Sequence, residues 1–219
     1  MGKTRRTAYE RWLKRALDLL LCVPGLALLL AAGLVIAVAI EIDDPGPVFF
    51  TQERIGRDKK RFRLHKFRSM RMSTPHDTPT HLLQDPEQYI TRVGRFLRRS
   101  SLDELPQIWD IFLGSMSVVG PRPALWNQDD LIAERDKYDA NSVRPGLTGW
   151  AQVNGRDELE IPEKARLDGE YIRALRAGVS AGLAMDARCF LQTIRSVAQH
   201  KGVVEGGTGA AGSKGETKR

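Results

Sequence analysis

The chain has 219 residues, 42% of them hydrophobic, which suffices for one substantial core with appendages. Its formal net charge of +7 favours an anionic partner: a nucleic acid, a phosphorylated substrate or an anionic membrane leaflet. The two cysteines, Cys22 and Cys189, form no metal or redox motif, which argues against a disulfide-stapled secreted domain and fits a reducing cytoplasmic setting.

An apolar run covers residues 19–40. Its 22 uncharged positions correspond to roughly 33 Å of helix, which matches the hydrocarbon core of a bilayer. The run is longer than the hydrophobic region of a usual signal peptide, and no secreted-looking, cysteine-paired domain follows it. We therefore expect a membrane-inserted segment that stays on the protein.

Basic residues flank this run on both sides, and the positive-inside rule places such flanks on the cytoplasmic face. A straight span leaves one flank on the wrong side, whereas a helix that enters and leaves through the same face satisfies both. Pro24 and Gly25 mark the expected bend, because proline removes an intrahelical hydrogen bond. We favour this re-entrant helix, with its bend at Pro24, over an ordinary span with a tolerated proline kink.

Two β-prone runs follow the turn cluster after the membrane segment. Residues 48–52 and 62–67 predict a hairpin just above the membrane. The basic residues between Arg54 and Arg71 are expected mostly to face lipid headgroups, and Lys66, inside the second strand, is the one expected to be functional.

Residues 73–91 are polar and contain three prolines, which is typical of a mobile loop. His76 and His81 lie in this stretch. Their spacing is not a metal signature, so we expect solvated histidines.

Acid, base and helix signals are densest in the middle of the chain. Ser101 and Glu104 have the spacing of a capping box, and Pro106 suits a first helical turn, so a helix is expected to begin near Asp103. It should end at Gly114 and bury a face of residues that recur at helical spacing: Leu105, Ile108, Trp109 and Phe112.

Asp103 and Glu104 would then lie at a helix N-terminus, where backbone N–H groups stabilise carboxylates and attract phosphate. Adjacent residues point about 100° apart around a helix, so we expect two different roles. Arg98 precedes the pair and Arg122 follows it between prolines, and arginine suits bidentate contact with phosphate. For an isolated pattern of this kind, capping acids beside a solvated arginine face would be the simpler interpretation.

The second half of the chain predicts helices at 126–140, 163–175 and 183–198 and a strand at 151–153. The last helix should bury one face, made of Met185, Phe190, Ile194 and Val197.

Three features of this half bear on function or order. Asp168 and Tyr171 share one helix, and Arg156 follows Gly155 in a turn suited to close approach of a phosphate. The glycine-rich residues from 202 onward are expected to be disordered.

These motifs together resemble the bacterial sugar transferases, the small monotopic phosphoglycosyl transferases that act on polyprenol phosphate. The resemblance covers roughly residues 12–200 and rests on many motifs in the same order: residues 14–18, 46–56, 66–70, 94–98, 101–107, 116–123 and 144–156, with Asp168 and Tyr171.

The resemblance implies an α+β fold, mainly helical and membrane-associated, with a small β-hairpin. Residues 1–47 would form the interfacial segment and re-entrant helix, 48–201 a catalytic domain on the cytoplasmic face of the inner membrane, and 202–219 a tail. The implied reaction moves a sugar-1-phosphate from a UDP-sugar to polyprenol (undecaprenyl) phosphate and releases UMP, which initiates assembly of a capsule, exopolysaccharide, O-antigen or glycoprotein.

The resemblance also implies site residues. Asp103 would be the nucleophile that forms an aspartyl-phosphosugar intermediate, and Glu104 would assist by positioning a metal or handling a proton. Mg²⁺ is the implied cofactor, held by these two acids. Other family positions that bind substrate or phosphate are matched by Lys66, Arg98, Arg122 and Asp168.

Two positions depart from the family pattern: Val23 precedes Pro24 where the family has a Ser-Pro pair, and Ser115 stands where relatives often carry Asp. A homodimer is left open. The competing hypothesis is a non-catalytic, membrane-anchored basic domain that binds anionic lipid or nucleic acid. The transferase hypothesis implies no nucleic-acid partner. A polytopic transferase without a covalent intermediate is disfavoured, because the chain has one membrane-length apolar run.

Overall fold

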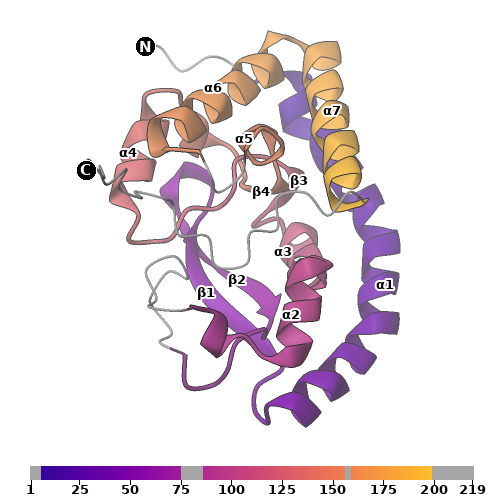
Figure 1. The fold of residues 1–219 in the computed structure, drawn as a ribbon. Coiled ribbons are helices and arrows are strands. Elements are labelled where there is room, and N and C mark those ends of the chain that lie inside the picture. Colours follow the sequence, from indigo (N-terminus) through magenta and orange to yellow (C-terminus); the bar gives the residue numbers. More distant parts are fainter. Residues whose placement is uncertain (1–5, 75–85, 156–158, 199–219) are drawn as a thin grey trace, which may run out of the picture.

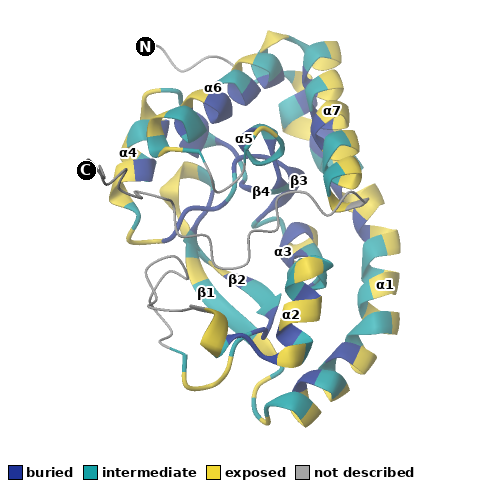
Figure 2. Cartoon of the chain, viewed as in Figure 1, coloured by how far each residue is buried: buried dark blue, intermediate teal, exposed yellow. Residues whose placement is uncertain are grey.

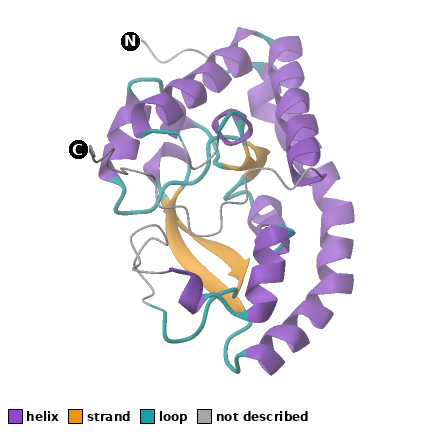
Figure 3. Cartoon of the chain, viewed as in Figure 1, coloured by secondary structure: helices purple, strands orange, loops and turns teal. Residues whose placement is uncertain are grey.

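The computed structural model describes residues 6–74, 86–155 and 159–198, which are mostly helical with short strands (Figures 1 and 3). The strands within these residues form a two-stranded antiparallel sheet and a two-stranded parallel sheet. This agrees with the expected mainly helical fold. Arg156, His76, His81 and the C-terminal tail lie outside the described residues.

The long helix near the N-terminus is α1, Lys14–Asp43, which continues a π-helical turn at Tyr9–Leu13. The combined segment is the one helix among the described residues that is long and apolar enough to cross a membrane. Many of its apolar side chains lie outside the core, and Leu30 is 79% exposed. Pro24 lies inside α1, which stays helical on both sides of it and curves along one side of the molecule (Figure 1). The re-entrant path and the bend at Pro24 stay predictions.

The predicted hairpin is confirmed. Strand β1 (Phe49–Ile55) pairs antiparallel with β2 (Arg61–Phe67), and Phe50 lies opposite Lys66. Side chains alternate between the two faces of a strand, so Lys66 shares a face with Leu64, which is buried in the main hydrophobic core. The hairpin therefore directs Lys66 toward the same side as the core.

Helix α2 (Arg92–Arg99) was not predicted from the sequence, and it packs on the C-terminal part of α1. Leu97 forms one buried cluster with Ile36, Ile40 and Phe67. Thr91 caps α2 by accepting a hydrogen bond from the Gly94 backbone N–H at 2.9 Å.

A 3₁₀ turn at Leu102–Glu104 precedes α3, Gln107–Leu113. The predicted helix start near Asp103 is wrong. Ser101 has φ of 57°, in the left-handed region, and its side chain makes no capping hydrogen bond, while Pro106 occupies the N-cap position of α3. The two acids therefore lie on a separate turn that joins α2 to α3.

The predicted buried face of α3 is also wrong for two aromatic residues. Trp109 and Phe112 are exposed, and their rings stack with centroids 5.7 Å apart. The buried residues of α3 are instead Gln107, Asp110 and Ile111. Apolar residues at helical spacing mark a face of a helix, but the spacing does not say whether that face meets a core.

Polar contacts fasten the first turns of α1 to the rest of the protein. Asp18 is buried and accepts hydrogen bonds from the Ser117 hydroxyl at 2.8 Å and from the Val118 backbone N–H at 2.9 Å. Arg15 donates to two backbone carbonyls at the C-terminal end of α3, where the helix dipole favours a cation: those of Ile111 at 2.6 Å and Phe112 at 2.9 Å.

The parallel sheet joins β3 (Ser117–Val119) to β4 (Gly146–Thr148). The strand predicted at 151–153 is wrong, because Trp150–Val153 forms the short helix α5 and the strand lies just before it. An added Cβ on Gly146 would lie 2.1 Å from the backbone nitrogen of Gly120, so the two segments meet at a distance that only glycine permits.

The remaining helices are α4 (Asp129–Asp136), α6 (Ile161–Ala177) and α7 (Val179–Ala198). Helix α4 is shorter than predicted, and α6 and α7 confirm the two predicted C-terminal helices. Figure 1 shows α7 lying beside the upper part of α1, and α6 crossing to α4.

The predicted buried face of α7 is wrong for three of its four residues, while Met185 is partly buried and packs against the main core. Phe190, Ile194 and Val197 are exposed, whereas Asp186 and Cys189 are buried. Figure 2 shows buried and exposed positions alternating along α7. Asp186 accepts hydrogen bonds from three side chains on two other segments, which explains why a polar residue lies inward: Tyr9 at 2.6 Å, Lys14 at 2.6 Å and Tyr171 at 2.9 Å.

Candidate active site

The two central acids share one turn but differ in their contacts. Glu104 accepts hydrogen bonds through one carboxylate oxygen, Oε1, from Lys66 Nζ at 2.8 Å and from Arg122 at 2.8 Å. Asp103 is 8% exposed, and its carboxylate has no hydrogen-bond donor among the residues that the structure describes. One acid is thus held in an ion-pair network, and the other remains available for chemistry.

The electrostatics of the two acids differ in the same way. Burial alone would raise the pKa of Glu104, but Arg122 and Lys66 outweigh it and hold this pKa well below the ordinary value. Burial raises the pKa of Asp103; Lys66 opposes that rise, and the negative charge of Glu104 adds to it. Environments that separate the pKa values of two neighbouring acids are typical of sites where the acids have different roles.

Lys66 is positioned by a contact between β2 and α3. The neighbouring His65 donates its backbone N–H to Asp110 at 2.9 Å, and its ring Nδ1 lies 2.7 Å from the same carboxylate. Asp110 is buried, and burial raises its pKa while the His65 contacts oppose the rise. Because the strand is fixed to the helix at this point, the ammonium group of Lys66 is held beside Glu104.

Arg122 lies in a rigid backbone segment. The Gly120 backbone N–H donates to Thr148 at 2.8 Å, and the Gly146 N–H donates to Pro121 at 2.9 Å. Arg135 donates to the Arg122 backbone carbonyl at 2.9 Å. The backbone is therefore held by hydrogen bonds both before Arg122 and at its own carbonyl, which restricts the position of the guanidinium that contacts Glu104.

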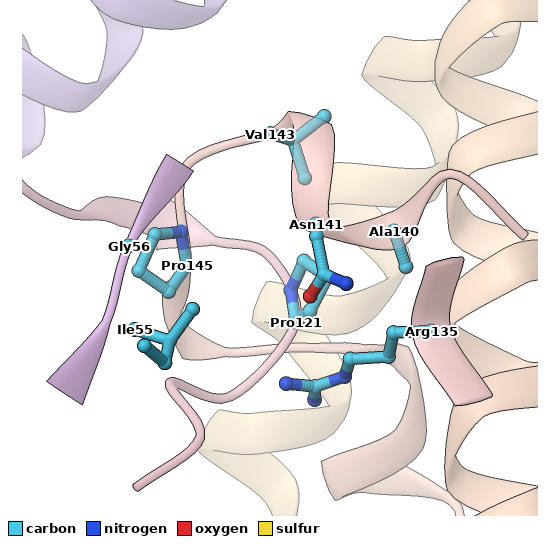
Figure 4. A pocket seen from close by; sticks show the side chains of 8 residues that line it. All are labelled: Ile55, Gly56, Pro121, Arg135, Ala140, Asn141, Val143 and Pro145. Atoms are coloured by element: carbon cyan, nitrogen blue, oxygen red, sulfur yellow. The ribbon is translucent and has the colours of Figure 1, made fainter. Parts of the chain in front are cut away.

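Arg135 is itself held by Asp168. Two nitrogens of the Arg135 guanidinium, Nε and one terminal nitrogen, lie 2.7 Å from Asp168 Oδ2, and Asp168 is 1% exposed. Burial raises the pKa of Asp168, and Arg135 opposes the rise. Figure 4 shows the Arg135 guanidinium below Pro121, beside a cavity of about 10 Å³ that is lined by residues from several segments: Ile55, Gly56, Pro121, Ala140, Asn141, Val143 and Pro145.

The structure thus connects Asp168 to the site through Arg135 and the Arg122 backbone, and it does not bring the Asp168 carboxylate to Asp103 or Glu104. The predicted direct contact between Asp168 and phosphate stays a prediction. Arg98 is brought to the site: its positive charge lowers the pKa of Asp103, and its Nε donates to the Ser69 hydroxyl at 2.9 Å. The predicted contact of Arg156 with phosphate lies outside the described residues.

Sequence reasoning missed Arg54, which lies on β1. Its guanidinium donates to the Pro123 carbonyl at 3.1 Å and to Gln52 at 2.6 Å, and its Nε has no partner among the described residues. Burial and the positive charge of Arg122 together lower the pKa of Arg54 to about 10, although the negative charge of Glu104 opposes them. Side chains alternate between the two faces of a strand, so Gln52 and Arg54 could have been placed on the same face of β1 from the sequence. Arg54 was not singled out because it lies within a run of basic residues.

The site is therefore a partly buried turn that carries two carboxylates among four cationic side chains: Arg54, Lys66, Arg98 and Arg122. Such a set neutralises a multiply charged phosphate ester while it leaves one carboxylate able to react.

Comparison with known proteins agrees with this chemistry. The family model of the bacterial sugar transferases matches residues 9–200, so the chain belongs to the bacterial sugar transferase family. It is 40% identical over 183 residues to the UDP-glucose:undecaprenyl-phosphate glucose-1-phosphate transferase of Escherichia coli (strain K12), which covers 78% of this chain and 38% of that protein.

Two further relatives show how length varies in the family. The enzyme of the same name from Xanthomonas campestris pv. campestris is 42% identical over 179 residues, which cover 78% of this chain and 37% of that protein. The uncharacterized sugar transferase EpsL of Bacillus subtilis (strain 168) is 36% identical over 196 residues, which cover 87% of this chain and 90% of that protein. The chain thus spans less than two fifths of the first two relatives and most of the third.

Proposed function

We propose that this protein transfers a sugar-1-phosphate from a UDP-sugar to a membrane polyprenol phosphate and releases UMP. One observation carries the proposal: the Asp103 carboxylate is buried among cations, yet it has no hydrogen-bond donor within the described residues. Membership of the sugar transferase family and the names of the two enzymes reported above support the same reaction class.

The reaction proceeds in two displacements at the same phosphorus. A carboxylate oxygen of Asp103 attacks the phosphorus that carries the sugar, and the bond from that phosphorus to the bridging oxygen breaks, so UMP leaves with the bonding electron pair. A phosphate oxygen of the polyprenol phosphate then attacks the same phosphorus. The aspartyl oxygen–phosphorus bond breaks, and the Asp103 carboxylate is restored.

The cations supply most of the catalytic stabilisation, because charge spreads over the phosphoryl oxygens in the transition state. Lys66 and Arg122 are held together by Glu104, so they are oriented before the substrate arrives. Arg98 adds positive charge on the side of Asp103. Glu104 is then a positioning group for the two cations rather than a second nucleophile.

The acids also fit a bound Mg²⁺. The ion is commonly held by one or two carboxylates together with substrate phosphates, and Asp103 and one oxygen of Glu104 provide that number. No cluster of three or more acidic, histidine or cysteine side chains suited to a metal is found among the described residues, so Asp103 and Glu104 are the residues that would hold the ion. A bound Mg²⁺ would supply additional neutralisation of the negative charge on the diphosphate.

The protein acts at the cytoplasmic face of the bacterial inner membrane, where α1 enters and leaves one leaflet with its bend at Pro24. The basic flanks of the apolar run and the length of the helix support this placement. A monotopic anchor of this kind brings a soluble donor and a lipid acceptor to the same turn.

The test is transfer of labelled sugar-phosphate into lipid, measured in nanodiscs that contain polyprenol phosphate, with a panel of UDP-sugars. Asp103→Asn should abolish transfer while the protein stays in the nanodisc, and Asp129→Asn, which changes an exposed acid on α4, should leave transfer unchanged. If Asp103→Asn retains transfer, the nucleophile is misassigned. If the wild type transfers nothing from any donor, the non-catalytic membrane-anchored domain becomes the better hypothesis.

A further inference from the structure

Helix α2 carries a basic stripe that the active site does not use. Arg92, Arg95, Phe96 and Arg99 fall within about 100° around the helix axis, because they are spaced by three or four residues. All four side chains are exposed, and Phe96 is 62% exposed. With Ser100 they line a hollow of about 430 Å³ on the surface.

The three arginines have no acidic partner among the described residues. Some exposed arginines elsewhere do have such partners: Arg61 contacts Glu53 at 3.4 Å, and Arg166 contacts Glu163 at 2.7 Å. Others, such as Arg63 and Arg195, have none within the described part of the chain, and what distinguishes α2 is that three such arginines lie together on one face of a helix. No acid lines the hollow either. It therefore presents three uncompensated positive charges and one aromatic ring.

The position of α2 places this hollow at the end of the membrane helix. Leu97, on the opposite side of α2, packs with Ile36 and Ile40 near the C-terminus of α1. The backbone N–H of Val93 donates to Asp43 at 2.8 Å. The apolar run of α1 gives way to acids at this point, so α2 lies at the level where hydrocarbon ends and lipid headgroups begin.

We propose that the hollow formed by Arg92, Arg95, Phe96, Arg99 and Ser100 binds the phosphate headgroup of an anionic phospholipid. Guanidinium groups bind phosphate oxygens in a bidentate manner, and an aromatic side chain suits the membrane interface. The site is separate from the catalytic turn, and it rests on the membrane placement of α1 rather than on the transferase reaction. Its occupant would fix α2, and with it Arg98, against the bilayer surface.

Native mass spectrometry of the full chain tests this, after release from nanodiscs that contain equal amounts of phosphatidylglycerol and phosphatidylcholine. The wild type should retain phosphatidylglycerol over phosphatidylcholine by on the order of tenfold, since each basic residue near an anionic surface contributes to the preference. The triple variant Arg92→Gln, Arg95→Gln, Arg99→Gln should lose the preference. A triple replacement of the same arginines by lysine should keep most of it, because the charges remain.

The control variant removes three exposed charges elsewhere, outside the basic run of residues 54–71: Lys137→Gln, Arg166→Gln and Arg173→Gln. It should retain phosphatidylglycerol as the wild type does. The proposal is overturned if the wild type binds the two lipids equally, or if the glutamine variant of α2 retains as much phosphatidylglycerol as the control variant. Displacement of the lipid by excess inorganic phosphate would also overturn it, because the hollow would then be a site for soluble anions.

Discussion

The replacement Asp168→Ala should destabilise the protein strongly. Asp168 and Arg135 are both buried, with side-chain exposures of 1% and 6%, so solvent does not screen the pair. Removal of one partner from a buried pair leaves an uncompensated charge, which costs about 3–5 kcal/mol. For a chain of about 200 residues, each kcal/mol lowers Tm by about 2–4 °C, so we expect a decrease of at least 6 °C.

The assay is thermal unfolding of the detergent-solubilised protein, followed by tryptophan fluorescence. Burial raises the pKa of Asp168 despite the presence of Arg135, so the attraction within the pair does not fully offset the burial of its charge. The double variant Asp168→Leu, Arg135→Met should therefore recover most of the lost Tm. Its activity should still be reduced, because the Arg122 carbonyl loses its donor.

Two results would refute this reasoning. A decrease of less than 2 °C for Asp168→Ala would mean that the charge of Arg135 is solvated when its partner is removed. Full loss of transfer at unchanged Tm would instead assign Asp168 a direct contact with substrate.

The remaining predictions concern the catalytic turn and its supports. Asp103 must be ionised to attack, so the rate of adduct formation should rise with pH as this carboxyl group, whose pKa is raised, loses its proton. In a pH–rate profile, Glu104→Gln should shift the rise in rate to lower pH, because the variant removes a neighbouring negative charge. Lys66→Met should shift the same rise to higher pH, since it removes the cation that most opposes the raised pKa. Asp110→Ala should lower the free energy of unfolding, measured by denaturant titration, by about 1–3 kcal/mol, because it leaves two His65 donors unpaired. A pH–rate profile identical to that of the wild type would contradict the prediction for Glu104→Gln or for Lys66→Met. An unchanged unfolding midpoint would contradict the prediction for Asp110→Ala.

Short-range patterns in the sequence predicted much of this fold. The hairpin follows from two β-prone runs around a polar turn, and α6 and α7 follow from helical periodicity. The family motifs located Lys66, Arg98 and Arg122 around the two acids, and the structure brings these three cations to the same turn.

Contacts between distant segments could not be predicted from such patterns. Asp18 meets Ser117 across 99 positions of the chain, and no local spacing indicates this hydrogen bond. Helical periodicity predicts that one face of α3 and one face of α7 pack in the core, but periodicity cannot show what an apolar face contacts. Trp109 and Phe190, which belong to these predicted faces, are exposed. The capping pattern at Ser101 failed because its left-handed backbone turns the chain before α3 begins.

The most direct test of the central claim is the intact mass of the protein in nanodiscs with Mg²⁺ and a panel of UDP-sugars, without lipid acceptor. The proposed mechanism predicts that wild-type protein gains the mass of one sugar-phosphate with at least one donor, and that Asp103→Asn gains none. If the wild type shows no adduct with any donor, yet transfers sugar-phosphate once polyprenol phosphate is added, the transfer is direct and Asp103 is not a covalent nucleophile.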